Sequence, residues 1–203
     1  MIFNFCNSKK FQTRVFINNS LLEQVRQTKL LGLIISEDLS WHANTNNLVK
    51  KAYMRMSILR KLYEFNVPKA QLVQIYILYI RSITEQSSVV WGPSITEEES
   101  SALERTQKVA LRIIYRHEYI SYDNALHLSK LLPLVKRREQ LLKKFAFKTW
   151  KNPKTTQMIR LNVPNRVLRK QEKFRVDNAR TTRLANSTLN KIAHLLNKRS
   201  TKQ

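Results

Sequence analysis

The hydrophobic and polar positions of the chain change their pattern near residue 40. Before that point short apolar runs alternate with polar turns. Residues 15–17 are an apolar run followed by Asn18-Asn19, and residues 30–35 form a second run that only Gly32 interrupts. Runs of this length bounded by turn residues are typical of strands. The second run predicts a strand covered on both faces, and Ile2, Phe3 and Phe5 predict another at the start of the chain.

From residue 44 onward the apolar positions recur at helical intervals. One stripe predicts a helix that ends near Asn66, because Pro68 disfavours helical geometry at the residue before it. A second helix begins at Pro68 or Lys69 and is apolar on nearly all sides as far as Ile83, which predicts the buried central helix of a bundle. The stripe of the first helix consists of Leu48, Ala52, Met56, Leu59 and Tyr63.

Later helices are predicted from capping and periodicity. After Gly92-Pro93, Thr96 and Glu99 form a capping box, and the acidic residues 97–99 suit the positive end of a helix dipole. We expect a short helix over 122–129, a long one over 134–150, a linker to about Asp177 and a last helix over 186–197. The inner face predicted for the long helix is Leu134, Leu141, Leu142, Phe145 and Ala146, and its outer faces hold Lys136, Arg137, Arg138, Lys143, Lys144 and Lys148.

Together these patterns predict an α+β, mainly α fold. Short antiparallel strands occupy residues 1–40, a helical bundle 41–150, and a basic, partly irregular tail with a C-terminal helix 151–203. We read Trp41 and Trp91 as packing anchors where the strands meet the helices.

The charge of the chain changes the picture more than its length does. Its 203 residues include 37 Lys and Arg against 14 Asp and Glu, so the net charge is +23, and residues 151–203 carry 14 of the basic residues but 2 of the acidic ones. Such a field attracts polyanions, of which nucleic acid is the commonest. An anionic membrane surface is the physical competitor, but no helix pairs a basic face with a Trp-rich apolar one, and no apolar run approaches 18 residues.

Basic residues recur once per turn on the predicted helices, as contacts to successive phosphates require. A solvated helix face is the alternative explanation for each single residue. Tyr53, Tyr63, Tyr115 and Tyr119 are candidates for stacking on unpaired bases, with core packing as the alternative. The candidate nucleic-acid-binding residues are Lys50, Lys51, Arg55, Lys61, Arg105, Lys108, Arg112, Arg116, Lys143 and Lys144.

Motifs for catalysis or metal binding are not found in the sequence. The four histidines lack zinc spacing, and with two glycines no glycine-rich phosphate loop is possible. The three aspartates, Asp38, Asp123 and Asp177, are not adjacent. The single cysteine, Cys6, fits a reducing, intracellular setting, nuclear or cytoplasmic. We therefore expect no catalytic residue, metal or cofactor in this chain.

Four segments resemble reverse transcriptases of non-LTR (LINE-type, jockey-like) retrotransposons: LLGLIISEDLSW at 30–41, LVKKAYMRMSILRKL at 48–62, LYIRSITEQSSVVW at 78–91 and LERTQKVALRII at 103–114. Segments 136–155 and 172–187 resemble the region that follows the thumb. The resemblance implies that 1–40 completes a palm, that 41–150 is a thumb-like bundle, and that the parent enzyme copies RNA into DNA with magnesium. It also implies missing fingers and a missing palm with paired catalytic aspartates.

The leading hypothesis is thus a polymerase fragment that is inactive alone and binds a template–primer duplex. Two alternatives remain open: a stand-alone basic nucleic-acid-binding module, and an enzyme completed by a separate palm and fingers as partner. Residues 72–114 also resemble a segment at the N-terminus of an AlkB-type repair homologue, but the iron-binding pattern of such dioxygenases is missing.

Overall fold

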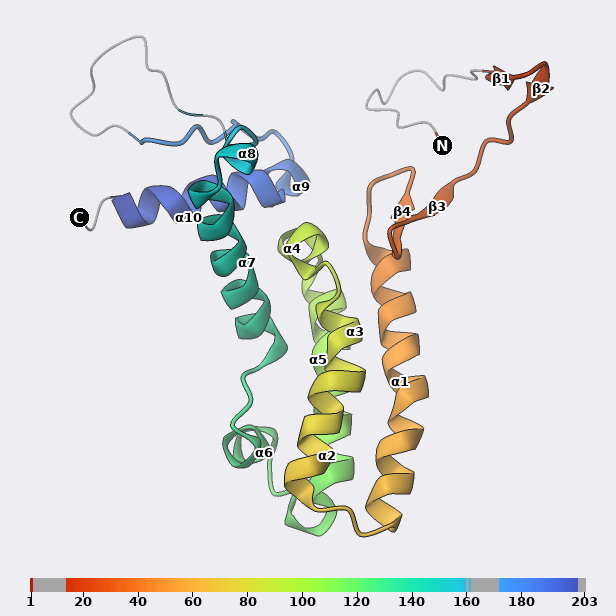
Figure 1. Cartoon of the computed structure of the whole chain (residues 1–203), viewed down its shortest axis with the longest axis vertical. Helices are drawn as coiled ribbons and strands as arrows, with labels where there is room; N and C mark the ends of the chain where they lie inside the picture. The colour runs from red at the N-terminus through yellow and green to blue at the C-terminus, as the bar shows by residue number, and fades with distance from the viewer. Residues whose placement is uncertain (2–13, 160, 162–171, 201–203) are drawn as a thin grey trace.

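The computed structural model describes residue 1, residues 14–159, residue 161 and residues 172–200. The strand predicted at Ile2, Phe3 and Phe5, and Cys6, lie outside the described residues. The fold is α+β and mainly α, as predicted, with two small antiparallel hairpins before the helices (Figure 1).

Both hairpins turn through two residues of positive φ. β1 (Phe16–Ile17) pairs with β2 (Ser20–Leu21) around Asn18-Asn19, which confirms the predicted turn. β3 (Gln27–Leu30) pairs with β4 (Leu33–Ser36) around Leu31 and Gly32, whose φ angles are 49° and 86°. Two successive positive φ values give the turn twist that hairpins prefer, and glycine adopts such a φ without a steric cost.

The single covered strand predicted over 30–35 is therefore wrong. The chain folds back at Gly32, so β3 is exposed along its length and only β4 reaches the core, through Leu33 and Ser36. Asn44, in the first helix (His42–Glu64), links that helix to β4, because its Oδ1 accepts a hydrogen bond from Ile34 N at 3.1 Å.

The helices lie in two groups (Figure 1). α1 (His42–Glu64) packs beside a long broken helix over residues 69–85 and beside α5 (Glu97–Tyr115). α7 (Leu134–Lys151) lies on the far side of α5 and contacts α10 (Thr188–Ser200). The described elements after α1 are α2 (Lys69–Ile75), the π-helix η1 (Tyr76–Arg81), α3 (Ser82–Glu85), α4 (Ser88–Trp91), the 3₁₀ turn η2 (Gly92–Ser94), α5 (Glu97–Tyr115), the 3₁₀ turn η3 (Arg116–Glu118), α6 (Tyr122–Ser129), α7 (Leu134–Lys151), α8 (Pro153–Thr156), α9 (Thr182–Ala185) and α10 (Thr188–Ser200).

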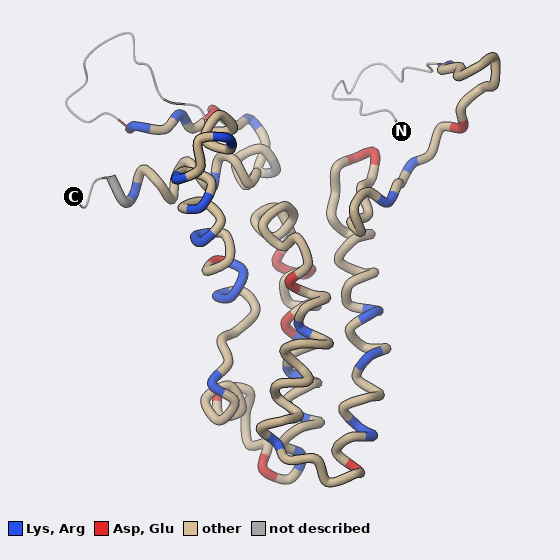
Figure 2. Tube along the Cα trace, viewed as in Figure 1, with Lys and Arg blue, Asp and Glu red and all other residues tan. Residues whose placement is uncertain are grey.

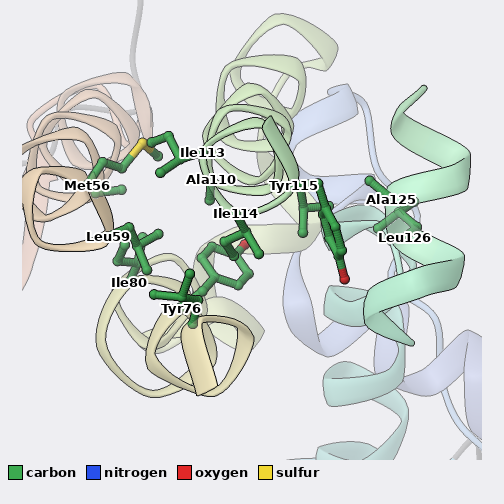
Figure 3. Packing of buried hydrophobic residues seen from close by; sticks show 13 residues of the cluster. Met56, Leu59, Tyr76, Ile80, Ala110, Ile113, Ile114, Tyr115, Ala125 and Leu126 are labelled. Atoms are coloured by element: carbon green, nitrogen blue, oxygen red, sulfur yellow. The ribbon is translucent and has the colours of Figure 1, made fainter. Parts of the chain in front are cut away.

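The main core fills the space between α1, the α2–η1 helix and α5 (Figure 3). Met56 of α1 lies against Ile113, and Leu59 lies near Ile80 and Tyr76. The predicted stripe of α1 is confirmed, since Leu48, Ala52, Met56 and Leu59 are buried and Tyr63 packs against the cluster. Tyr115, Ala125 and Leu126 extend this core to α6.

The helix that starts at Lys69 is not buried all round, contrary to prediction. Leu72, Tyr76 and Ile80 are buried, but Leu78 is 75% exposed on the opposite face. A second departure is the π-helical segment η1, in which the chain is wound more loosely than in an α-helix. One apolar face of this helix therefore meets solvent. The central position predicted for it belongs instead to α5, which contacts α1, α2, α6 and α7.

α5 begins where the capping box was predicted. Thr96 Oγ1 accepts from Glu99 N at 3.2 Å, and Glu99 Oε2 accepts from Thr96 N at 2.7 Å. Trp91 is fully buried before it, donating through Nε1 to Gln86 O at 2.9 Å, and Trp41 packs against the same cluster. Both tryptophans are packing anchors, as predicted.

The inner face of α7 agrees only in part with the predicted one. Leu134, Leu142 and Ala146 are buried, but Phe145 is 39% exposed and Arg138, assigned to an outer face, is 9% exposed. The buried positions recur at intervals of four from 134 to 146, so Arg138 falls inside the stripe.

Residues on both sides of position 150 share one small core. Leu142 and Ala146 of α7 pack with Ile159, Phe174 and residues of α10, and Trp150 meets Phe174 edge to face at 4.8 Å between ring centroids. Thr188 also donates to Val89 O at 2.8 Å. The predicted last helix exists but begins two residues later, at Thr188, and the domain boundary at 150 stays a prediction.

Candidate nucleic-acid interface

Four of the ten candidate residues lie on α1. Lys50, Lys51 and Lys61 are exposed, while Arg55 is half-buried and contacts the π-helix η1. Its Nη1 donates to Tyr79 O at 2.7 Å, and its guanidinium carbon lies 4.2 Å from the centre of the Tyr79 ring. Arg55 therefore links α1 to η1, and only some of the N–H donors of its guanidinium face solvent.

The basic stripe of α5 lies opposite its buried face, and three of its four members rest on tyrosine rings. Lys108 Nζ lies 5.1 Å from the ring centre of Tyr122, and Arg112 lies 5.3 Å from that of Tyr119. The fourth member, Arg105, is exposed. An aromatic ring attracts a cation without neutralising its charge, at about 0.5–1 kcal/mol for an exposed pair. The rings thus hold these cations in place and leave their charge available.

Arg116 lies beyond the end of α5 rather than on it. It caps the helix with a φ of 36° and opens η3, so the stripe bends at this point. Its guanidinium carbon lies 4.2 Å from the ring centre of Tyr63 near the end of α1. The bend brings Arg116 to the last turn of α1, which also carries Lys61.

Lys143 and Lys144 are exposed on α7. Because α5 stands between α7 and α1, the ten residues do not form a single surface (Figures 1 and 2). Figure 2 shows Lys and Arg recurring along α1 and along α7, with Asp and Glu gathered at the start of α5. The structure therefore leaves the α7 pair apart, and it brings Arg116 of the α5 stripe to α1, where its guanidinium lies over the ring of Tyr63.

None of the ten residues forms an ion pair with a carboxylate among the described residues. The partners of the described carboxylates lie elsewhere: Arg137 contacts Glu85 through Nε at 3.0 Å and Nη2 at 3.3 Å, and Lys69 pairs with Glu118. Arg81 Nε is also 3.0 Å from Glu85 Oε1 but lacks hydrogen-bond geometry. The ten candidates thus keep an uncompensated positive charge.

The predicted stacking role of tyrosines is restricted by their surroundings. Tyr115 is buried, and Tyr63 and Tyr119 each have a cation over the ring. Of the four candidates, Tyr53 is 39% exposed and carries no cation contact. Core packing explains Tyr115, support of a cation explains Tyr63 and Tyr119, and stacking at Tyr53 stays a prediction.

A polar network beneath the α5 stripe joins it to α6 and α7. Gln107 accepts from Tyr76 Oη at 2.8 Å and donates to Tyr122 Oη and Leu132 O, both at 2.9 Å. Tyr122 in turn donates to Glu104. Burial, together with the hydrogen bond to Glu104, raises the pKa of Tyr122 well above its usual range, so the phenol stays neutral and remains a donor. This network fixes the ring on which Lys108 rests.

Sequence reasoning missed the buried arginine of α7. Arg138 donates through Nη2 to Ser100 Oγ at 2.6 Å, and burial lowers its pKa despite the nearby carboxylates of Glu104 and Glu139. Arg138 lies four residues from both Leu134 and Leu142, and this spacing indicates that the three residues share the inner face. The prediction of an outer position for Arg138 did not take this spacing into account.

Within the described part of the chain, no three His, Cys, Asp or Glu side chains are grouped so as to hold a metal ion, and no helix is long and apolar enough to cross a membrane. A scan against models of protein families, a search of curated proteins and a search of solved structures each returned no match for the chain.

Proposed function

We propose that this chain binds nucleic acid through its phosphate backbone, using the basic residues of α1 and α5 as the main contact surface. The observation that carries the proposal is the uncompensated positive charge of the ten candidate residues, none of which pairs with a described carboxylate. The described carboxylates that form ion pairs do so with other residues.

The arrangement suits phosphate contact in two ways. Exposed Lys50, Lys51 and Lys61 carry compact charges on flexible stems, which adapt to a phosphate at variable distance. Arg112 and Arg116 rest on tyrosine rings, so less side-chain entropy is lost when each guanidinium binds two phosphate oxygens. Such contacts position a duplex or a strand and carry no sequence information.

The resemblance to LINE-type reverse transcriptases extends this proposal. We infer a thumb-like bundle that grips a template–primer duplex, in the nucleus or the cytoplasm of the cell. Because Asp38, Asp123 and Asp177 are far apart in the sequence, the proposed activity is binding and not polymerisation. Palm and fingers residues, with magnesium, belong to the parent enzyme that the resemblance implies.

The test is the salt dependence of affinity for an RNA/DNA duplex, measured by fluorescence anisotropy with the full chain. Each neutralised phosphate releases counterions, so a plot of log K against log salt has a negative slope of about 0.7–0.9 per contact. The triple variant Lys50→Gln, Lys61→Gln, Arg112→Gln is expected to reduce that slope by roughly 2–3 and to weaken binding.

A matched control is Lys29→Gln, Lys130→Gln, Lys154→Gln, three exposed residues outside the proposed surface. Both triple variants remove the same charge, so a general field effect changes them equally. Equal loss of affinity in both, or an affinity that does not depend on salt, would contradict the proposed surface. A primer-extension assay with the chain alone is expected to yield no product.

A further inference from the structure

A cavity of about 530 Å³ lies between η2, the first turn of α5, α7 and α10. Its volume falls in the range of about 300–1,000 Å³ that is usual for small-molecule sites. Arg138 and Ser100 line it, together with Lys143 and Lys191, and Glu97 and Glu139 also contribute to the lining. The cavity is thus formed by elements that are distant in the sequence.

Arg138 is the unusual residue of this cavity. It is 9% exposed, yet it forms no ion pair with any carboxylate of the described residues, and its hydrogen bond goes to the neutral hydroxyl of Ser100. A guanidinium has five N–H donors in a planar fork. Glu104 and Glu139 act on this charge from beyond ion-pair contact. Because a buried charge is costly unless it is paired, an anion in the cavity would supply the direct charged partner that the protein does not.

The charge of the lining has the right sign for such an anion. Apart from Lys198, which also interacts elsewhere, three basic residues line the cavity: Arg138, Lys143 and Lys191. The two acidic residues of the lining, Glu97 and Glu139, are both exposed. This positive lining attracts a phosphate monoester, which carries about −1.5 to −2 at neutral pH. Guanidinium and phosphate also match in shape, since two parallel N–H donors can bind two phosphate oxygens.

We propose that this cavity binds a phosphate monoester, with Arg138 as its principal contact and Lys143 and Lys191 as supporting cations. The ligand is a free nucleotide or the terminal phosphate of a nucleic-acid strand. This site is separate from the α1 and α5 residues proposed above as the main contact surface, and Lys143, which lines it, lies on α7.

The first arm of the test uses AMP with adenosine as its control, and binding is followed by calorimetry on the full chain. AMP is expected to bind and adenosine is not. The variant Arg138→Met is expected to weaken AMP binding by roughly 10- to 100-fold, the usual cost of losing hydrogen bonds to a charged group. Because Arg138 makes no ion-pair contact, its removal is also expected to leave the melting temperature unchanged or higher, whereas a merely structural arginine would lower it when replaced.

Two further variants keep the test decisive. Arg138→Lys retains the charge without the planar fork and is expected to give an intermediate loss, and Lys191→Gln gives a second estimate if Arg138→Met does not fold. Lys136→Gln is the matched control, because Lys136 is exposed on the same helix and does not line the cavity. AMP affinity that is equal in wild type, Arg138→Met and Lys191→Gln would overturn the proposal.

The second arm compares 5′-phosphorylated with 5′-hydroxyl oligonucleotides. A preference for the phosphorylated strand that Arg138→Met abolishes assigns the site to strand ends, and AMP binding without that preference assigns it to free nucleotides. No binding of AMP together with no preference between the oligonucleotides would refute the site. Affinity for the 5′-hydroxyl strand tests the helix surfaces separately, because Arg138→Met is expected to leave it unchanged.

Discussion

The side chain of Glu104 caps the helix α7 from a neighbouring helix, and its removal offers a direct test of how α5 holds α7. Glu104 Oε1 accepts from Leu134 N at 3.1 Å and Oε2 accepts from Val135 N at 3.3 Å, while Tyr122 donates to the same carboxylate. Pro133 precedes α7 and supplies no side-chain cap of its own. The first N–H groups of a helix lack internal partners, so Glu104 takes the place of the missing cap.

The expected cost of Glu104→Ala follows from these contacts. Losing a side-chain cap costs about 0.5–2 kcal/mol, and losing the Tyr122 hydrogen bond costs about 1 kcal/mol more. Val135 is 43% exposed, so water can reach part of the freed backbone and the loss stays below the full value for buried charged hydrogen bonds. We expect a decrease of about 2–3 kcal/mol in the free energy of unfolding, or roughly 4–12 °C in melting temperature for a chain of this size.

The assay is guanidinium unfolding followed by circular dichroism, with Glu64→Ala as the control. Glu64 is exposed in the last turn of α1 and forms no ion pair among the described residues, so its replacement removes the same charge without removing a cap. A loss in Glu104→Ala no larger than that in Glu64→Ala would refute the capping role.

Three other substitutions test separate parts of the fold. Leu59→Ala, at a fully buried position, is expected to lower the free energy of unfolding by about 2–5 kcal/mol, whereas Leu78→Ala on the exposed face of η1 is expected to cost under about 0.5 kcal/mol. Phe174→Ala is expected to cost about 3–5 kcal/mol in chemical denaturation, because its ring is buried between α7 and α10. Tyr122→Phe is expected to be less stable than wild type near neutral pH, with a difference that shrinks as the pH rises from about 9.5 to about 11.

The sign of the last effect follows from the raised pKa of Tyr122. In the unfolded chain this phenol ionises at the ordinary tyrosine pKa of about 10, whereas burial and Glu104 keep it protonated to a higher pH in the folded chain. Its contribution to stability is therefore complete below about pH 10 and is lost above it, by about 1.4 kcal/mol per pH unit. A pH-independent difference between wild type and Tyr122→Phe would contradict this reasoning. An equal cost for Leu59→Ala and Leu78→Ala, or no loss of stability in Phe174→Ala, would contradict the packing described.

Local signals in the sequence determined most of the secondary structure. Thr96 and Glu99 predicted the start of α5 because a capping box acts within one turn of helix, and the stripe from Leu48 to Leu59 predicted the buried face of α1 for the same local reason. The exposed basic positions of α1 and α5 were also identified, since a residue opposite an apolar stripe faces solvent wherever the helix packs.

Tertiary structure decided the rest, because burial on a helix depends on what its neighbours cover. The apolar residues near Leu78 looked buried, yet α1 and α5 cover only one side of that helix, and the apolar run at Gly32 became a hairpin because its turn could reverse the chain. Arg138 became a buried cation beside a cavity only when α5, α7 and α10 packed together. The sequence by itself thus determined the helices and the sign of the charge, and packing determined which charges are buried, which rest on tyrosine rings and which meet solvent.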